Sequence, residues 1–184
     1  MKLKAGMFIL AFISTNAIAQ PHKPLYGLTY SHSISNGMDT VPVNMHGYRV
    51  GFWYQPETWQ WRYLNIFMDL TFGHWWVNGS TPNKMVNSYA LSPVFRFFLM
   101  KNNRFSPFID ASIGLTYLSR TRLGNRNLGM HFSFQDQLGI GVAIGRFQEF
   151  SVSLNAIHYS NASLCKHNSG ITQPLNVSLQ YGFG

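Results

Sequence analysis

The segment from Leu175 to Phe183 alternates without a break between apolar and polar or small side chains, and this alternation strongly constrains the fold. Leucine, valine and aromatic residues occupy its odd positions, and asparagine, serine, glutamine and glycine occupy its even positions. A β-strand places successive side chains on opposite faces, so such a segment has one apolar and one polar face. Other segments alternate similarly or more weakly, at 25–34, 43–54, 64–72, 88–98, 109–117, 130–144 and 151–160. Together they predict eight β-strands.

Composition indicates where these strands lie. Charged residues make up only 11% of the chain and aromatic residues 16%, whereas soluble globular domains carry about 25% charged residues. Beyond the N-terminal segment, no apolar run approaches the roughly 18 residues that a spanning helix needs. Strands of a membrane barrel turn an apolar face to lipid and a polar face to the lumen. We therefore predict an all-β fold, an eight-stranded antiparallel transmembrane β-barrel of the outer membrane.

The N-terminus has the features of a secretory signal peptide. Lys2 and Lys4 precede an apolar run over 7–13, and Ala17-Ile-Ala19 supplies small residues for cleavage. We predict a signal peptide over residues 1–19 and a single barrel domain over 20–184. Removing Lys2 and Lys4 lowers the formal net charge from +8 to +6, so the mature chain is still basic.

Each connection between strands can be assigned to one side of the membrane once the N-terminus of the barrel is placed on the periplasmic side. Periplasmic turns are expected near 56–61, 101–106 and 145–149, and outer loops near 36–41, 78–87, 119–127 and 165–171. Five tryptophans lie towards the predicted strand ends, where interfacial aromatic girdles belong: Trp53, Trp59, Trp61, Trp75 and Trp76.

Two polar side chains interrupt the lipid-facing row of segment 151–160. Serine and asparagine at 151, 153 and 155 face the lumen, so the same parity turns His158 and Ser160 outward. Residues two apart on one strand face have Cα atoms about 6.5–7 Å apart, which lets an imidazole nitrogen meet a seryl oxygen. A histidine that accepts the seryl proton activates the oxygen for attack on an ester. The pair therefore predicts an esterase site open to lipid. The alternative is interfacial polar residues without chemistry.

Asp136 adds a carboxylate to this outward patch. It interrupts the lipid-facing parity of segment 130–144, where an isolated carboxylate is costly. A turn centred on residue 147 or 148 places Asp136 opposite His158 or Ser160, where it would orient the histidine and stabilise its cation. The alternatives are an acid that only tunes the patch, or a bulge that turns it inward. The Asn161 side-chain amide and a backbone N–H near Ser163 are the expected oxyanion donors.

Four stretches resemble the lipid A 3-O-deacylase family of PagL type, outer-membrane enzymes that remove the 3-position acyl chain of lipid A. They are SPVFRFF at 92–98, PFIDASIGLTYLSRTRLGNRNLG at 107–129, FSFQDQLGIGVAIG at 132–145, and AIHYSNASL through NSGI at 156–171. The resemblance implies an eight-stranded barrel with a Ser-His-acid hydrolase on its outer surface, no metal or cofactor, and lipid A in the outer leaflet as partner. It matches Ser160 to the nucleophile, His158 to the base, and Asn161 and Ser163 to the oxyanion hole.

The position of the acid departs from the family. The family places a carboxylate just after the N-x-G-I turn, where this chain has Thr172 and Gln173. Ungapped alignment gives Thr172, whereas the parity of the last strand puts Gln173 on the lipid face with Leu175. Neither side chain carries charge, so either Gln173 orients His158 by hydrogen bonding or Asp136 supplies the carboxylate. A weakened or inactive homologue is the alternative.

Basic outer loops fit the same substrate, because arginine grips phosphate bidentately. The arginines beside the proposed site are Arg120, Arg122 and Arg126; the alternative is that they bridge surrounding lipopolysaccharide.

Competing classes of protein are a non-enzymatic outer-membrane barrel and a soluble lipocalin-like barrel with an apolar lumen. Export argues against nucleic acid, and no histidine pair has convincing metal-ligand spacing. A homodimer is compatible with the sequence.

Overall fold

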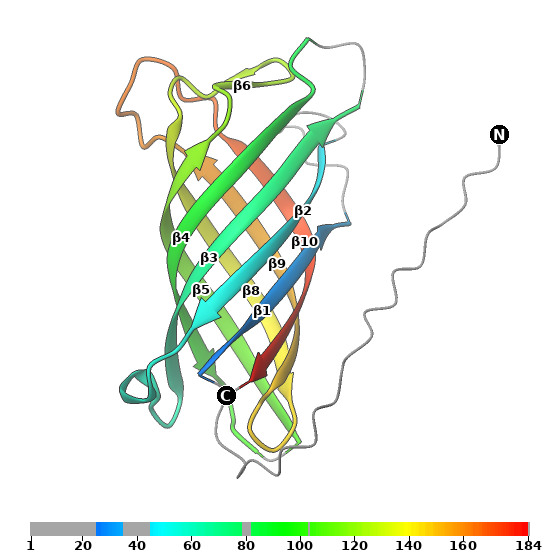
Figure 1. Cartoon of the computed structure of the whole chain (residues 1–184), viewed down its shortest axis with the longest axis vertical. Helices are drawn as coiled ribbons and strands as arrows, with labels where there is room; N and C mark the ends of the chain where they lie inside the picture. Colours follow the sequence, from blue (N-terminus) through cyan, green and yellow to red (C-terminus); the bar gives the residue numbers. More distant parts are fainter. Residues whose placement is uncertain (1–24, 35–44, 79–81, 103, 184) are drawn as a thin grey trace, which may run out of the picture.

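The structure is a computed structural model that describes residues 25–34, 45–78, 82–102 and 104–183. The predicted signal peptide and the predicted outer loop at 36–41 lie outside the described residues. Within them, eight long strands close into an antiparallel barrel in the order β1-β10-β9-β8-β5-β4-β3-β2 (Figure 1). These strands are β1 (Tyr26–Ser33), β2 (Met45–Tyr54), β3 (Leu64–Val77), β4 (Met85–Phe98), β5 (Phe105–Leu118), β8 (Phe132–Ile144), β9 (Phe150–Ser160) and β10 (Ile171–Phe183). The predicted eight-stranded barrel is confirmed.

Two short elements lie in the connections. The 3-10 turn η1 (Glu57–Trp59) lies between β2 and β3, and the hairpin of β6 (Arg122–Leu123) and β7 (Arg126–Asn127) lies in the loop between β5 and β8. This hairpin stands above the end of the barrel opposite the C-terminus (Figure 1), in a segment that the sequence predicted only as a loop. No helix within the described residues is long and apolar enough to span a membrane.

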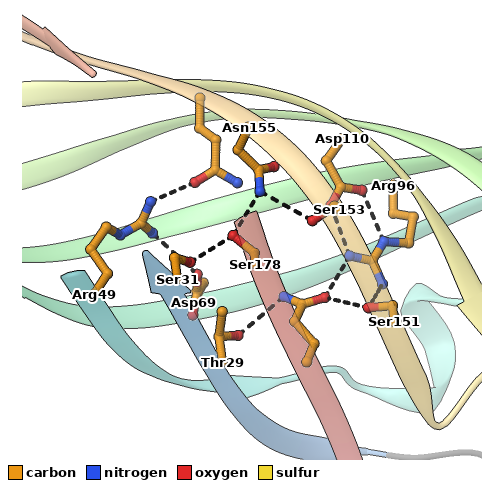
Figure 2. A network of polar contacts seen from close by, with 12 residues as sticks. Thr29, Ser31, Arg49, Asp69, Arg96, Asp110, Ser151, Ser153, Asn155 and Ser178 are labelled. Carbon is orange, nitrogen blue, oxygen red and sulfur yellow. Dashed lines mark hydrogen bonds and ion pairs between the residues drawn. The ribbon is translucent and has the colours of Figure 1, made fainter. Parts of the chain in front are cut away.

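The barrel is apolar outside and polar in the middle of its lumen, as the strand alternation predicts. On the outer face Leu138 and Ile140 are 61% and 60% exposed. Inside, the Arg96 guanidinium donates to both carboxylate oxygens of Asp110, at 2.9 and 2.7 Å (Figure 2). Arg49 donates to the Gln137 side chain at 2.7 Å. A polar lumen and an apolar exterior are the arrangement of a membrane barrel, and the reverse of the arrangement expected for a lipocalin.

The outer end of the lumen departs from this pattern, because large apolar side chains fill it. Trp75 and Tyr159 are fully buried there, with ring centroids 5.9 Å apart in an edge-on arrangement. We call this group the outer apolar cluster: Met45, Trp75, Val77, Val86, Leu118, Leu123, Leu128, Ile157, Tyr159 and Ile171. Ile157 and Tyr159 alternate with the outward His158 and Ser160 along β9, so the cluster anchors the strand end that carries the polar pair.

Two of the five tryptophans do not join an interfacial girdle. Trp53 and Trp75 point into the lumen and are 9% and 0% exposed, whereas Trp59 and Trp61 are exposed. Each inward indole lies against a glycine of the paired strand: a Cβ built on Gly47 would come within 2.2 Å of Trp75, and one on Gly27 within 2.5 Å of Trp53. The expectation was wrong for these two residues because strand parity turns them inward and the glycines give them room.

Candidate active site

The polar patch predicted on the outer surface assembles from three neighbouring strands. His158 of β9 pairs with Asp136 of β8 on one side and with Thr172 of β10 on the other. Ser160 pairs with Phe134 of β8. All four polar side chains are half-buried on the outward face of their strands. Of the two registers expected from the turn near residue 147, the structure has the one that places Asp136 opposite His158.

The ladder between β8 and β9 is regular at this point, running from the pair Phe134–Ser160 to the pair Ile144–Phe150 without a shift. No bulge therefore turns Asp136 inward, and its carboxyl group stays on the same face as the imidazole. Directly paired residues on one face have Cβ atoms about 4.5–5.5 Å apart. Asp136 and the imidazole are thus direct neighbours on the outward face.

The imidazole of His158 is held from two sides. Its Nδ1 lies 2.7 Å from Oγ1 of Thr172. Gly170 lies against the other side: a Cβ built on this residue would be 3.0 Å from Cε1 of His158 and 3.5 Å from Nε2. Gly170 also has a φ of +59°, a conformation that glycine adopts without steric cost. With Nδ1 engaged by the hydroxyl, Nε2 is the ring nitrogen left for Ser160.

Gln173 lies on the opposite face from the one that the sequence predicted. It is 0% exposed and faces the lumen. The parity argument failed because β10 contains a bulge: Gln173 pairs with Ile157 and Asn176 with Asn155, so Pro174 and Leu175 together oppose one residue of β9. This bulge returns Thr172, the residue of the ungapped alignment, to the outer face.

Pro174 was the available sequence signal for this bulge. Proline has no N–H to donate to a ladder, so inside a sheet it is confined to edges, strand starts and bulges. A proline in the middle of an otherwise alternating strand therefore marks the point where the parity of the preceding residues becomes uncertain. Reading Pro174 in this way would have selected Thr172 over Gln173.

The Asn161 side-chain amide, predicted as an oxyanion donor, is hydrogen-bonded inside the loop. Its side chain is 1% exposed, and Nδ2 donates to the carbonyl oxygens of Leu128 and His167 at 2.9 and 2.8 Å. Its backbone N–H donates to Oδ1 of Asn168 at 3.0 Å, and the Ser163 N–H donates to Oδ1 of Asn161 at 3.0 Å. The donors expected at 161 and 163 are therefore used within the loop, which Asn161 holds in place.

The turn that follows Ser160 nevertheless presents one backbone donor. Ala162 and Ser163 have φ values of 51° and 63°, and each left-handed residue with a side chain costs roughly 1–2 kcal/mol. Such strained residues concentrate at functional sites. Ala162 is exposed, and among the described residues its N–H has no acceptor. Two positions after the serine, this N–H is the free donor of the turn.

The three predicted arginines do not converge on one point. Arg126 donates to the carbonyl of Ser169 at 3.2 Å, directly before Gly170, so the β6–β7 hairpin is tied to the loop beside His158. Arg120 and Arg122 are exposed and line a surface hollow together with His131. Within the described part of the chain, no three His, Cys, Asp or Glu side chains gather in a way that could hold a metal ion.

Comparisons with known proteins agree with this architecture. The family model described as lipid A 3-O-deacylase (PagL) matches residues 46–181. A lipid A deacylase PagL of Pseudomonas aeruginosa is 35% identical over 119 residues, which are 65% of this chain and 64% of that protein. One of Bordetella bronchiseptica is 27% identical over 166 residues, 90% of this chain and 88% of that protein.

A solved structure supports the same assignment at the level of the fold. The crystal structure of the outer membrane enzyme PagL superposes with a TM-score of 0.68 at 26% identity, covering 86% of this chain and 99% of that one. The family match extends over β2 to β10 and includes every residue of the outward patch. The chain therefore belongs to the PagL family of lipid A 3-O-deacylases.

Proposed function

We propose that this chain is an outer-membrane serine hydrolase that removes the ester-linked acyl chain at the 3-position of lipid A. One observation carries the proposal: His158 and Ser160 lie on the lipid-facing side of β9, with Asp136 directly across from His158 on β8. Polar groups are costly on this face of a barrel, and these three occupy neighbouring positions on it. A lipid in the outer leaflet reaches this point laterally, without entering the lumen.

The reaction follows from the roles of the two polar residues of β9. His158 Nε2 takes the proton of the Ser160 hydroxyl while Oγ attacks the ester carbonyl carbon, whose π electrons move onto the oxygen. Collapse of this intermediate expels the sugar oxygen, which takes the proton from Nε2 and leaves an acyl-serine. Water then attacks the acyl-serine with His158 as base, which releases a 3-hydroxy fatty acid and restores Ser160.

The oxyanion of the tetrahedral intermediate needs a donor aimed at it. We assign this role to the backbone N–H of Ala162, the free donor in the turn after the nucleophile. Asn161 acts indirectly, because its buried hydrogen bonds hold that turn. For the phosphates of lipid A, the exposed Arg120 and Arg122 offer cationic contacts around their hollow.

Mass spectrometry of lipid A tests the proposal. In a Gram-negative host whose lipid A keeps its 3-position chains, expression of the native chain should remove the mass of one 3-hydroxyacyl group. Ser160→Ala and His158→Ala should each abolish this loss. Ser153→Ala is the matched control, because Ser153 lies on the same strand but faces the lumen at 6% exposure, and it should leave the loss intact.

Two results would reject the proposal: an unchanged lipid A profile with folded native barrel in the outer membrane, or full loss of the acyl group with Ser160→Ala. The first result would favour a non-enzymatic barrel.

Two further expectations, the signal peptide and the homodimer, have their own measurements. N-terminal sequencing of the purified membrane protein checks cleavage before Gln20, and cross-linking in intact membranes checks for a homodimer.

A further inference from the structure

We infer that the third position of the catalytic triad is divided between two residues on opposite strands: Thr172 of β10 sets the tautomer of His158, and Asp136 of β8 supplies the negative charge. The inference rests on the proposed hydrolase function and concerns how that site works. In a Ser-His-Asp triad one carboxylate does both tasks, since it accepts the Nδ1–H bond and stabilises the imidazolium.

The first task falls to Thr172 because of where its hydroxyl lies. Oγ1 is 2.7 Å from His158 Nδ1, within the range of a well-formed hydrogen bond. A hydroxyl oxygen has lone pairs to accept the Nδ1 proton. With the proton on Nδ1, the lone pair of Nε2 is available to the Ser160 hydroxyl. We assign the threonine hydroxyl as the acceptor that favours this productive tautomer, and it brings no charge.

The second task falls to Asp136. When His158 takes the seryl proton it becomes a cation on the lipid-facing side of a barrel, where an unpaired charge is expensive. The side chains that face it from the adjacent strands are Asp136 from β8 and Thr172 from β10. Only Asp136 among them is an acid. It stands opposite the imidazole on the outward face, so it stabilises the cation without occupying Nδ1.

The bulge in β10 makes this division possible. Pro174 and Leu175 share one partner residue on β9, so the residues of β10 that precede them change faces. Thr172 therefore faces outward beside His158. A regular strand would turn the buried Gln173 outward in its place. The bulge therefore determines which side chain of β10 reaches Nδ1.

Rates of purified native and variant barrels on lipid A in mixed micelles separate the two roles. Asp136→Asn keeps the size of the side chain and removes the charge. A unit charge at about 5–6 Å, roughly the spacing of directly paired side chains, with an effective dielectric near 20 predicts a fall in kcat of roughly 100- to 300-fold. Thr172→Val keeps the shape and removes the acceptor, and the loss of one neutral hydrogen bond predicts a fall of about five- to tenfold. KM should change little in both.

A rescue experiment tests whether one residue at position 172 can supply both the hydrogen bond to Nδ1 and the negative charge. Thr172→Glu places a carboxylate next to Nδ1, so in the Asp136→Asn background it should restore most of the lost kcat. The matched control for Thr172→Val is Thr116→Val. It removes a threonine hydroxyl that is 2% exposed in the lumen on β5, and it should not alter kcat. If Thr172→Glu restores nothing to Asp136→Asn, the assignment of charge to Asp136 is wrong.

Nitrogen NMR of histidine-labelled barrel in micelles gives a readout that does not depend on turnover. The His158 signal is identified by its loss in His158→Gln. In the native protein neutral His158 should carry its proton on Nδ1, and Thr172→Val should shift the population towards the Nε2–H form. A native Nε2–H tautomer would overturn the role of Thr172 whether or not the barrel hydrolyses lipid A, and native-like kcat in Asp136→Asn would overturn the role of Asp136. Absence of turnover with the expected Nδ1–H signal would instead count against the proposed function alone.

Discussion

Replacing Gly170 by alanine displaces the imidazole of His158 without removing any polar group of the site. The added Cβ would lie 3.0 Å from Cε1 of His158, whereas unstrained carbon contacts lie at about 3.5–4.0 Å. The ring must therefore move by a few tenths of an ångström. Because a misplacement of about 1 Å costs on the order of 100-fold in rate, we expect Gly170→Ala to lower kcat by roughly three- to tenfold.

The same substitution also has a backbone cost that must be separated from the catalytic one. At a φ of +59°, a side chain costs roughly 1–2 kcal/mol in the folded state. Gly124→Ala is the matched control, because Gly124 has a φ of +58° in the turn of the β6–β7 hairpin. Both variants should lose this backbone contribution to the unfolding free energy, but only Gly170→Ala should lose activity.

Initial rates of acyl release from lipid A in mixed micelles, measured on barrels of equal folded fraction, give the catalytic effect. Urea unfolding in the same detergent gives the free energies. A folded Gly170→Ala variant with kcat within twofold of the native value would refute the reasoning, since the glycine would then not control the position of His158. Equal loss of rate in Gly124→Ala would refute it as well.

Three further predictions concern stability and the loop after Ser160. Arg96→Met leaves Asp110, which is 2% exposed, as a buried charge without its guanidinium, so urea unfolding should show a loss of about 3–5 kcal/mol; adding Asp110→Asn should recover part of it, and no loss would contradict the buried ion pair. Asn161→Ala removes the buried amide that holds the turn, so limited proteolysis should cut residues 161–170 faster and acyl release should fall; unchanged cleavage would contradict this. Ser163→Gly relieves a φ of 63° and should raise unfolding free energy by up to about 1 kcal/mol with activity retained; a decrease would contradict the strain.

Much of the active face could be predicted from the sequence. Period-two alternation places each side chain through its immediate neighbours, so the outward direction of His158 and Ser160 followed from the lumen-facing residues of the same strand. The register between β8 and β9 was equally predictable, because a short turn restricts which residues can pair. Asp136 was expected opposite His158 or Ser160, and the structure pairs it with His158.

The sequence alone thus determined the barrel, the outward parity of β9 and the position of Asp136 beside His158, all of which follow from local periodicity and short connections. The tertiary structure decided the rest, because those features depend on where a strand ladder becomes irregular and on how the loops fold back. The bulge at Pro174 brings Thr172 to His158, and the carbonyl oxygens of Leu128 and His167 accept the hydrogen bonds of the Asn161 amide. Alternation specifies the face of a side chain only while the ladder is regular. Where β10 bulges or a loop folds back, the neighbouring strand or loop determines which side chain faces outward and which hydrogen-bond donors are already used.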